Sequence, residues 1–210
     1  MITKRFFKAC LLSISCLFYG SFALAQTAAQ ELQTQLDGFN SLTADFEQRV
    51  INSDMQLVDL LTGRFFLKRP GLFKWKYADA EQDIVSDGKN IYFIMQDLEQ
   101  VIERNFSTAL ETVPSLILVT DSSKLSELFT IEKLTTQTRG ERFQLTPKSS
   151  DSSYESVMVS FLNGKLLGLR LVDVLGQTTE IILSGVTNNP DIPNNEFKVD
   201  IPKGFDVIQG

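Results

Sequence analysis

The sequence predicts one domain that is mainly β, with about ten antiparallel strands and a few short helices. Apolar and polar residues alternate with a period of two along most of the chain, which is typical of strands with one wet face. Two strong turn signals, Asp87-Gly88 and Asn163-Gly164, each separate two such segments, as in tight hairpins. A sheet of this size cannot leave a wide apolar face in water, so we expect a sandwich, a closed barrel or a curved sheet with a cover.

The first residues of the chain have the features of a secretory signal peptide. Basic residues precede a short apolar run, and the small-residue site Ala23-Leu24-Ala25 follows it. The apolar run is too short for a membrane span. We therefore expect cleavage after Ala25, which divides the chain into a signal peptide, residues 1–25, and a single domain, residues 26–210.

The cysteines and the charge limit the possible function classes. Cys10 and Cys16 both lie in the signal segment, so the mature domain is expected to rely on its core without a disulfide. Ser13 stands three residues before Cys16, where a lipoprotein signal normally has leucine, so we expect no lipid anchor. The full sequence has a net charge of −6, and loss of the basic signal makes it more acidic. Such a chain binds nucleic acid or anionic membranes poorly, so no nucleic-acid partner is expected.

The first half of the domain is predicted from its periodicity and its turns. Apolar residues at intervals of three and four predict a short amphipathic helix over residues 26–39. Period-two alternation then predicts strands over residues 41–51, 55–68, 72–77, 82–86, 90–95 and 100–105. Pro70-Gly71 suits the two central positions of a type II turn, in a connection slightly longer than a two-residue hairpin.

The second half begins with a different pattern. Residues 112–119 form a continuous apolar run, which the polar residues 121–123 separate from Leu125 and Leu128. We expect two short helices there that can cover the sheet. Beyond them, alternation predicts strands over residues 129–136, 141–147, 154–162, 165–172 and 177–186. The tail from residue 188 is expected to be pinned by Phe197, Phe205 and Val207.

Residues 63–77 combine an aromatic strand, a turn and an isolated arginine, Arg69. Phe73, Trp75 and Tyr77 share one parity and the intervening lysines share the other, so one face of this strand carries the rings. On its own this pattern predicts a core-facing strand, and Arg69 on its own reads as a solvated turn residue. A curved sheet with a helical plug could also bury an apolar ligand against such a face.

Candidate catalytic residues are largely missing. The chain has no histidine, which excludes Ser-His-Asp and Cys-His catalysis and histidine metal sites. Ser123 and Lys124 are adjacent and do not form the S-x-x-K spacing of a serine–lysine pair. We therefore expect no enzyme, no metal site and no cofactor.

Several motifs resemble one known family in order and spacing. They are ADFEQ at residues 44–48, GRFFLKRPGLFKW at 63–75, VSDG at 85–88, DLEQV at 97–101, LTP at 145–147 and PKGFDV at 202–207. Over essentially the whole mature chain, the sequence resembles the periplasmic outer-membrane lipoprotein carrier family, LolA. The arginine–proline–aromatic–tryptophan run is the most specific part of this resemblance.

The resemblance implies a fold and a function. The fold is an incomplete, half-open antiparallel β-barrel covered by a helical lid. The function is that of a periplasmic chaperone: a monomer that takes acylated lipoproteins from an inner-membrane ABC-type transporter to an outer-membrane acceptor.

The resemblance also assigns residues to these roles. Arg69 is the latch that holds the lid closed. The residues expected to line an apolar cavity for acyl chains are Phe46, Phe73, Trp75, Tyr92 and Ile94. The residues expected to form the lid are Pro114, Leu116, Ile117 and Leu118. Ser115 stands where an aromatic or large apolar residue can occur in the family, which bears on how tightly the lid plugs the cavity.

Three other functions remain open at this stage. A lipoprotein acceptor of the same fold would need a lipidated cysteine. A lipid-sensing periplasmic regulatory module would bind lipid and a partner without delivering cargo. A hydrolase would turn over an acyl ester.

Overall fold

The structure is a computed structural model that describes residues 26–78, 82–109, 114–135 and 140–210. The expected signal peptide therefore lies outside the described residues. The strands are β1 (Ser41–Ile51), β2 (Leu57–Lys68), β3 (Leu72–Tyr77), β4 (Gln82–Asp87), β5 (Asn90–Met95), β6 (Gln100–Asn105), β7 (Phe129–Leu134), β8 (Glu141–Pro147), β9 (Tyr154–Leu162), β10 (Lys165–Asp173), β11 (Thr178–Asn188) and β12 (Asp206–Gln209). The α-helices are α1 (Ala28–Asp37), α2 (Phe106–Ala109) and α3 (Leu125–Leu128), and the 3-10 helices are η1 (Pro114–Leu118), η2 (Ser122–Lys124) and η3 (Asn194–Phe197).

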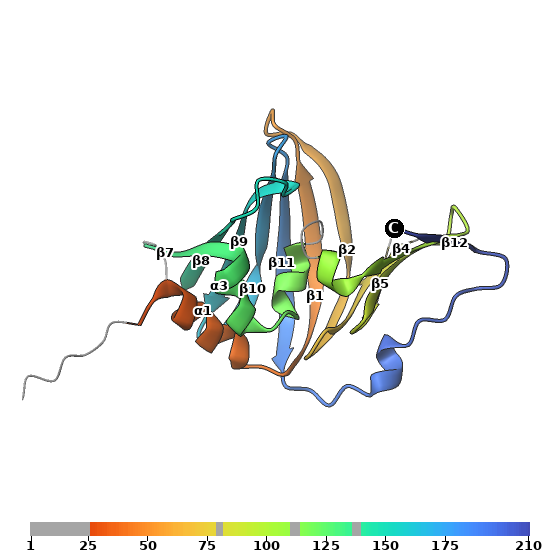
Figure 1. Ribbon diagram of the computed structural model, residues 1–210, viewed down its shortest axis with the longest axis horizontal. Coiled ribbons are helices and arrows are strands. Elements are labelled where there is room, and N and C mark those ends of the chain that lie inside the picture. The colour runs from red at the N-terminus through yellow and green to blue at the C-terminus, as the bar shows by residue number, and fades with distance from the viewer. Residues whose placement is uncertain (1–25, 79–81, 110–113, 136–139) are drawn as a thin grey trace, which may run out of the picture.

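All the described strands belong to one sheet, in the order β12-β6-β5-β4-β3-β2-β1-β11-β10-β9-β8-β7. Neighbouring strands are antiparallel, except that β12 runs parallel to β6. The two edges, β12 and β7, do not pair with each other, so the sheet stays open. Figure 1 shows it curving around α1 and the helical segments between β6 and β7. Of the three expected architectures, the curved sheet with a cover is therefore the observed one, and the expected half-open barrel is confirmed.

Most strands lie where the alternation places them. β1, β3, β5, β6, β8 and β9 have the predicted bounds. The turn at residues 69–71 connects β2 to β3, and Gly71 has the positive φ, 74°, that the predicted turn requires. The Arg69–Pro70 peptide bond is cis. β11 is longer than predicted, because it follows β1 as far as the pair Leu42 and Asn188.

The middle and the tail differ from the prediction. Three short helical segments, η1, η2 and α3, occupy the described part of the region where two helices were expected, and α2 precedes that region. In the tail, Phe197 is buried and Phe205 packs on a buried cluster, as expected, but Val207 is 47% exposed. Val207 is held instead through its backbone, because β12 pairs with β6 in the register Val207 to Val101.

The main core lies between the helices and the concave side of the sheet, which we call the inner face. α1 begins with a capping box between Thr27 and Gln30, which satisfies free backbone donors of its first turn. One side of the helix is fully buried through Leu32 and Leu36, and Phe39 follows it into the same cluster. This cluster also contains buried residues of strands from both halves of the sheet, so one core spans the domain.

A second, smaller cluster lies on the outer face of β4, β5 and β6. Val85, Ile94 and Val101 form it, and the tail covers it with Val199 and Phe205. In Figure 1 the tail leaves the end of β11, passes through η3 and returns to the sheet edge as β12. Two lysines, of β2 and β3, contact the part of the tail around η3.

The tail is anchored by lysines that the alternation places on the wet face. Lys68 Nζ donates to the Ile192 carbonyl at 2.8 Å and to Asn194 Oδ1 at 2.7 Å. Lys74 Nζ forms an ion pair with Glu196 at 3.1 Å. The outer face of this hairpin is therefore covered by the tail and is only partly in contact with solvent.

Candidate functional site

An aromatic wall forms the centre of the inner face. Phe46 of β1, Phe65 of β2 and Trp75 of β3 are each at most 3% exposed. The Trp75 ring centroid lies 4.9 Å from that of Phe46 and 4.6 Å from that of Phe65, in tilted arrangements. Phe65 and Trp75 are direct cross-strand partners, so strand pairing itself brings them together. Phe73, two residues before Trp75, is buried in the same core.

Gly63 makes this wall possible at its β2 position. It pairs with Phe46 on one side and with Tyr77 on the other. A Cβ atom at Gly63 would lie 2.1 Å from the Lys76 carbonyl oxygen and 2.6 Å from Cε1 of Phe46. The absence of a side chain therefore lets the Phe46 ring lie across β2, 5.3 Å from the Tyr77 ring in an edge-to-face arrangement.

The lid, by which we mean residues 114–119, packs the side chains of residues 116–119 into the same core. Leu116, Ile117 and Leu118 have no exposed surface, and Val119 is 2% exposed. Ser115 is partly buried, and Pro114 begins η1. Thr120 closes the turn with its backbone N–H and its hydroxyl, which both donate to the Leu116 carbonyl. The lid thus fills the concave side of the sheet with aliphatic side chains.

Arg69 joins the lid to the β2–β3 connection. Its Nε and Nη2 atoms donate to the Leu118 carbonyl at 3.1 and 2.8 Å. Its Nη1 lies 3.5 Å from Oδ1 of Asp37, and its guanidinium lies 5.0 Å from the centroid of Phe39. The backbone N–H of Gly71 adds a bond of 3.2 Å to the Val119 carbonyl. The end of the lid is therefore bound by this connection through both side chain and backbone.

The charges around Arg69 compensate for its burial. Burial lowers the pKa of Arg69, while the carboxylates of Asp37 and Asp121 act in the opposite direction. The pKa of an arginine is so high that the side chain stays charged at neutral pH. Asp37 also accepts a hydrogen bond of 2.7 Å from the Ser122 hydroxyl, just after the lid. A charged fork with nearby carboxylates therefore binds the end of the lid.

Tyr77 is the polar residue at the edge of the aromatic wall. Its hydroxyl donates to Oε1 of Gln48 at 3.1 Å. Burial raises the pKa of Tyr77 to about 12, and the charge of Asp59 acts in the same direction. The hydroxyl is therefore neutral at ordinary pH and serves as a hydrogen-bond donor.

Two residues predicted to line the cavity lie on the opposite face, which corrects the prediction. In the cross-strand rows, Trp75 pairs with Ile84 and Ile84 with Phe93, so Phe93 lies on the inner face, as does Ile91 of the same parity. Tyr92 lies in the row of Lys74, and Ile94 is a member of the outer cluster beneath the tail. The prediction was wrong because both parities of β5 are apolar, so its sequence does not show which face is inner.

Sequence reasoning also missed residues of the site. Asp37 and Phe39 surround Arg69, and Phe65 stacks on Trp75. Phe65 carried a usable signal, because it shares the parity that pairs with the rings of β3. Asp37 carried no such signal, because it ends α1, which is distant in sequence from the β2–β3 connection that it contacts.

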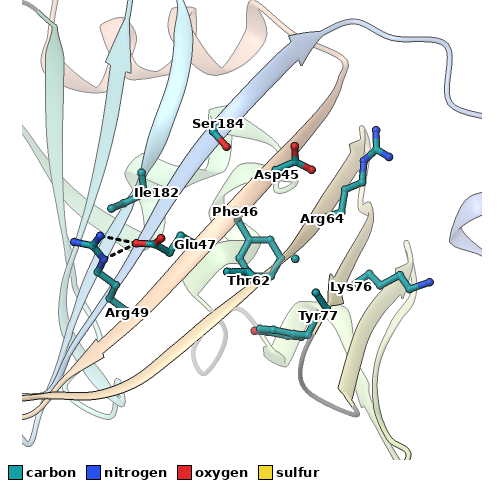
Figure 2. A pocket seen from close by; sticks show the side chains of 12 residues that line it. Asp45, Phe46, Glu47, Arg49, Thr62, Arg64, Lys76, Tyr77, Ile182 and Ser184 are labelled. Carbon is teal, nitrogen blue, oxygen red and sulfur yellow. Dashed lines mark hydrogen bonds and ion pairs between the residues drawn. The ribbon is translucent and has the colours of Figure 1, made fainter.

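A groove of about 750 Å³ lies near the outer surface of β1, β2, β3 and β11. Figure 2 shows its lining, in which Arg49 and Glu47 form an ion pair at 2.6 Å. Phe46 and Tyr77 also reach this groove, because Gly63 between them has no side chain. The groove therefore meets the edge of the aromatic wall, and charged side chains such as Asp45, Arg64 and Lys76 also line it.

The described residues hold no group of three or more acidic, histidine or cysteine side chains that could bind a metal ion. Within the same residues, no helix is long and apolar enough to cross a membrane. The structure presents an aromatic inner face that is covered by a short apolar segment, the lid. Concave apolar surfaces with a separate cover are typical of proteins that bind apolar ligands.

Comparison with known proteins identifies the family. The sequence matches the family described as outer membrane lipoprotein carrier protein LolA over residues 37–200. A relative from Pseudomonas putida, named outer-membrane lipoprotein carrier protein, is 37% identical over 205 residues, which cover 95% of this chain and 97% of the relative. A relative of the same name from Hahella chejuensis is 34% identical, with 95% and 96% covered. The chain belongs to the outer-membrane lipoprotein carrier family.

A solved structure agrees with this fold. A conserved protein from Thermus thermophilus matches with a TM-score of 0.54 at 13% identity, covering 86% of this chain and 100% of that chain. At this low identity, the similarity shows the shared fold alone.

Proposed function

We propose that this chain is a periplasmic carrier that binds the acyl chains of lipoproteins against the inner face of its sheet. Its family membership supports the nature of the cargo. The observation that carries the proposal is that the lid and the aromatic wall share one apolar core. An acyl chain offers the same kind of contact as the lid side chains, so it can take their place when the lid opens.

The magnitudes fit reversible binding. Burying an acyl chain of about sixteen carbons is worth on the order of 12 kcal/mol. Leu116, Ile117 and Leu118 together lose about 5–9 kcal/mol of burial when the lid opens, at about 1.5–3 kcal/mol each. The two Arg69 hydrogen bonds add about 3–6 kcal/mol, because bonds to charged donors are worth about 1.5–3 kcal/mol each. The cost of opening is comparable to the gain from cargo, so cargo can both enter and leave.

In this proposal Arg69 sets the balance between the closed and open states. Its bonds to the Leu118 carbonyl exist only while η1 lies against the hairpin. A cargo that binds the open state must overcome them, and the same bonds favour closure again once the cargo is passed on. Phe46, Phe73 and Trp75 then contact the acyl chains.

The route of the cargo is also part of the proposal. The chain receives lipoproteins from an inner-membrane ABC-type transporter and delivers them to an outer-membrane acceptor. It does so as a monomer that a signal peptide over residues 1–25 exports to the periplasm. The task requires binding and release, without a chemical step.

The proposal is tested by isolating the protein from the periplasm and identifying co-purifying molecules by mass spectrometry. We expect acylated lipoproteins, which purified transporter should load and purified acceptor should remove. Cargo that binds and cannot be handed to any second protein would favour a lipid sensor. Turnover of an acyl ester by the purified protein would favour a hydrolase.

A further inference from the structure

Trp75 carries a buried donor for which the described residues supply no partner. Its residue is 2% exposed, and among the described residues no acceptor lies within hydrogen-bond distance of the indole Nε1. Nearly all buried polar groups in native proteins have a partner, because leaving one unpaired is costly. An unpaired indole N–H in the middle of the aromatic wall therefore requires an explanation.

The packing of the wall does not require an indole. The chain has sixteen phenylalanines and this single tryptophan. Phe46 and Phe65, which flank Trp75, show that phenylalanine fills this surface. The faces of these rings are only weak acceptors for an N–H group. Compared with phenylalanine, a tryptophan at position 75 adds a larger ring and one N–H donor. A need for a larger ring does not explain why the donor is kept without a partner.

Three other donors on or beside the inner face have partners. The Tyr77 hydroxyl donates to Gln48, the Ser86 hydroxyl donates to the Gly71 carbonyl at 2.7 Å, and Arg69 donates to Leu118. Two carbonyls of the lid, those of Leu116 and Leu118, accept bonds from Thr120 and Arg69 and make none to the indole. Trp75 Nε1 thus differs from each of these donors in having no partner in the closed state.

We propose that Trp75 Nε1 donates a hydrogen bond to the ester or amide carbonyl at the head of a bound acyl chain. This inference deepens the proposed carrier function and rests on it. An acyl chain differs from a plain hydrocarbon by this carbonyl, which loses its water when the chain enters the inner face. The indole N–H meets that need and gains its own partner in the same step. The site therefore selects acyl chains over hydrocarbons of equal length.

Pairing of the indole N–H with cargo also favours the open state of the lid over the closed state. The closed state leaves the donor unpaired, whereas the cargo-bound state pairs it. This difference favours opening in the presence of acyl cargo beyond what apolar contact alone supplies, because a ligand shifts a two-state equilibrium only through its different interactions with the two states.

The test compares two ligands on two proteins. The ligands are the methyl ester of a medium-chain fatty acid and an alkane of the same length, and the proteins are the wild type and Trp75→Phe, which keeps a ring and removes the donor. We expect the variant to bind the ester about tenfold more weakly, or about 1.4 kcal/mol, with alkane affinity changed by less than about twofold. An equal loss for both ligands would overturn the inference and leave Trp75 as packing.

A second measurement needs no variant, so it also covers the case in which Trp75→Phe folds poorly. The single tryptophan gives one indole N–H signal in a nitrogen-15 NMR spectrum. The ester should shift this signal downfield and lower the carbonyl stretching frequency of the bound ester, and the alkane should do neither. An indole signal that responds alike to both ligands would overturn the inference while the carrier function stands. If neither ligand binds the wild type, the carrier function itself fails.

Discussion

Arg69 and Leu118 are joined by two hydrogen bonds, from Nε at 3.1 Å and from Nη2 at 2.8 Å, that end on a single carbonyl oxygen. Leu118 is the last residue of η1, where a helix leaves its carbonyls without internal partners. The same guanidinium lies over Phe39 and beside Asp37. The end of α1, the β2–β3 connection and the lid therefore meet at one side chain.

Arg69→Leu is expected to shift the protein towards the open state. It removes two bonds worth about 1.5–3 kcal/mol each and leaves the Leu118 carbonyl to water. Because the open state binds cargo, we expect the variant to load lipoprotein and to hand it over more slowly than the wild type. Loading and delivery are measured separately with purified transporter and acceptor.

Arg142→Leu is the matched control for this experiment. Arg142 is exposed on β8, in the half of the sheet away from the lid connection, and its loss should leave both steps unchanged. Equal delivery by Arg69→Leu and the wild type would show that apolar contacts alone hold the lid.

Phe73→Ala is expected to weaken acyl-chain binding, because Phe73 lies on the inner face with Trp75. The emission of Trp75, the single tryptophan, should shift on titration with a fatty-acyl ligand and report the affinity directly. Tyr92→Ala removes a ring from the outer face and should leave the affinity unchanged. An equal loss in the two variants would contradict our placement of the site.

Gly63→Val is expected to destabilise the fold by about 1–3 kcal/mol, the usual cost of overpacking. Its Cβ would lie 2.1 Å from a backbone carbonyl, and that backbone cannot move without breaking the pairing of β2 and β3. Urea unfolding measures the loss. Gly164→Asn is the control, because no atom lies within 4 Å of a Cβ there and asparagine tolerates its positive φ. A stable Gly63→Val protein would show that the two strands separate freely at this point.

Tyr77→Phe should change how stability depends on pH. The folded state holds the phenol proton with a pKa of about 12, above the ordinary value of 10.0. The stabilisation from this proton is complete below pH 10 and is lost as the pH rises towards 12, because only the unfolded chain ionises in that range. The wild type should therefore lose about 2–3 kcal/mol relative to the variant over this range. A stability difference that stays constant with pH would count against the buried phenol.

The processing of the chain is checked by intact mass. Because Ala23-Leu24-Ala25 suits signal peptidase, we expect the mature protein to begin at Gln26 without lipid. A diacylglyceryl mass on Cys16 would contradict both the soluble carrier and its periplasmic location.

The sequence by itself determined the local structure. The bounds of β1, β3 and β5 and the turn at Gly71 follow from alternation and from turn residues, which are properties of neighbouring residues. The match of family motifs along the chain pointed to the carrier family, which the comparison confirmed. The apolar character of Leu116, Ile117 and Leu118 likewise predicted burial, and they are fully buried.

Only the tertiary structure decided which faces and partners meet. β5 is apolar on both faces, and the distant tail covers one of them, so local pattern could not assign Tyr92 and Ile94. Lys74 reads as solvated until the tail brings Glu196 to it. Arg69 reads as a turn residue until the curved sheet brings the Leu118 carbonyl within its reach. In each case the deciding contact joins segments far apart in sequence, and periodicity carries no information about such contacts.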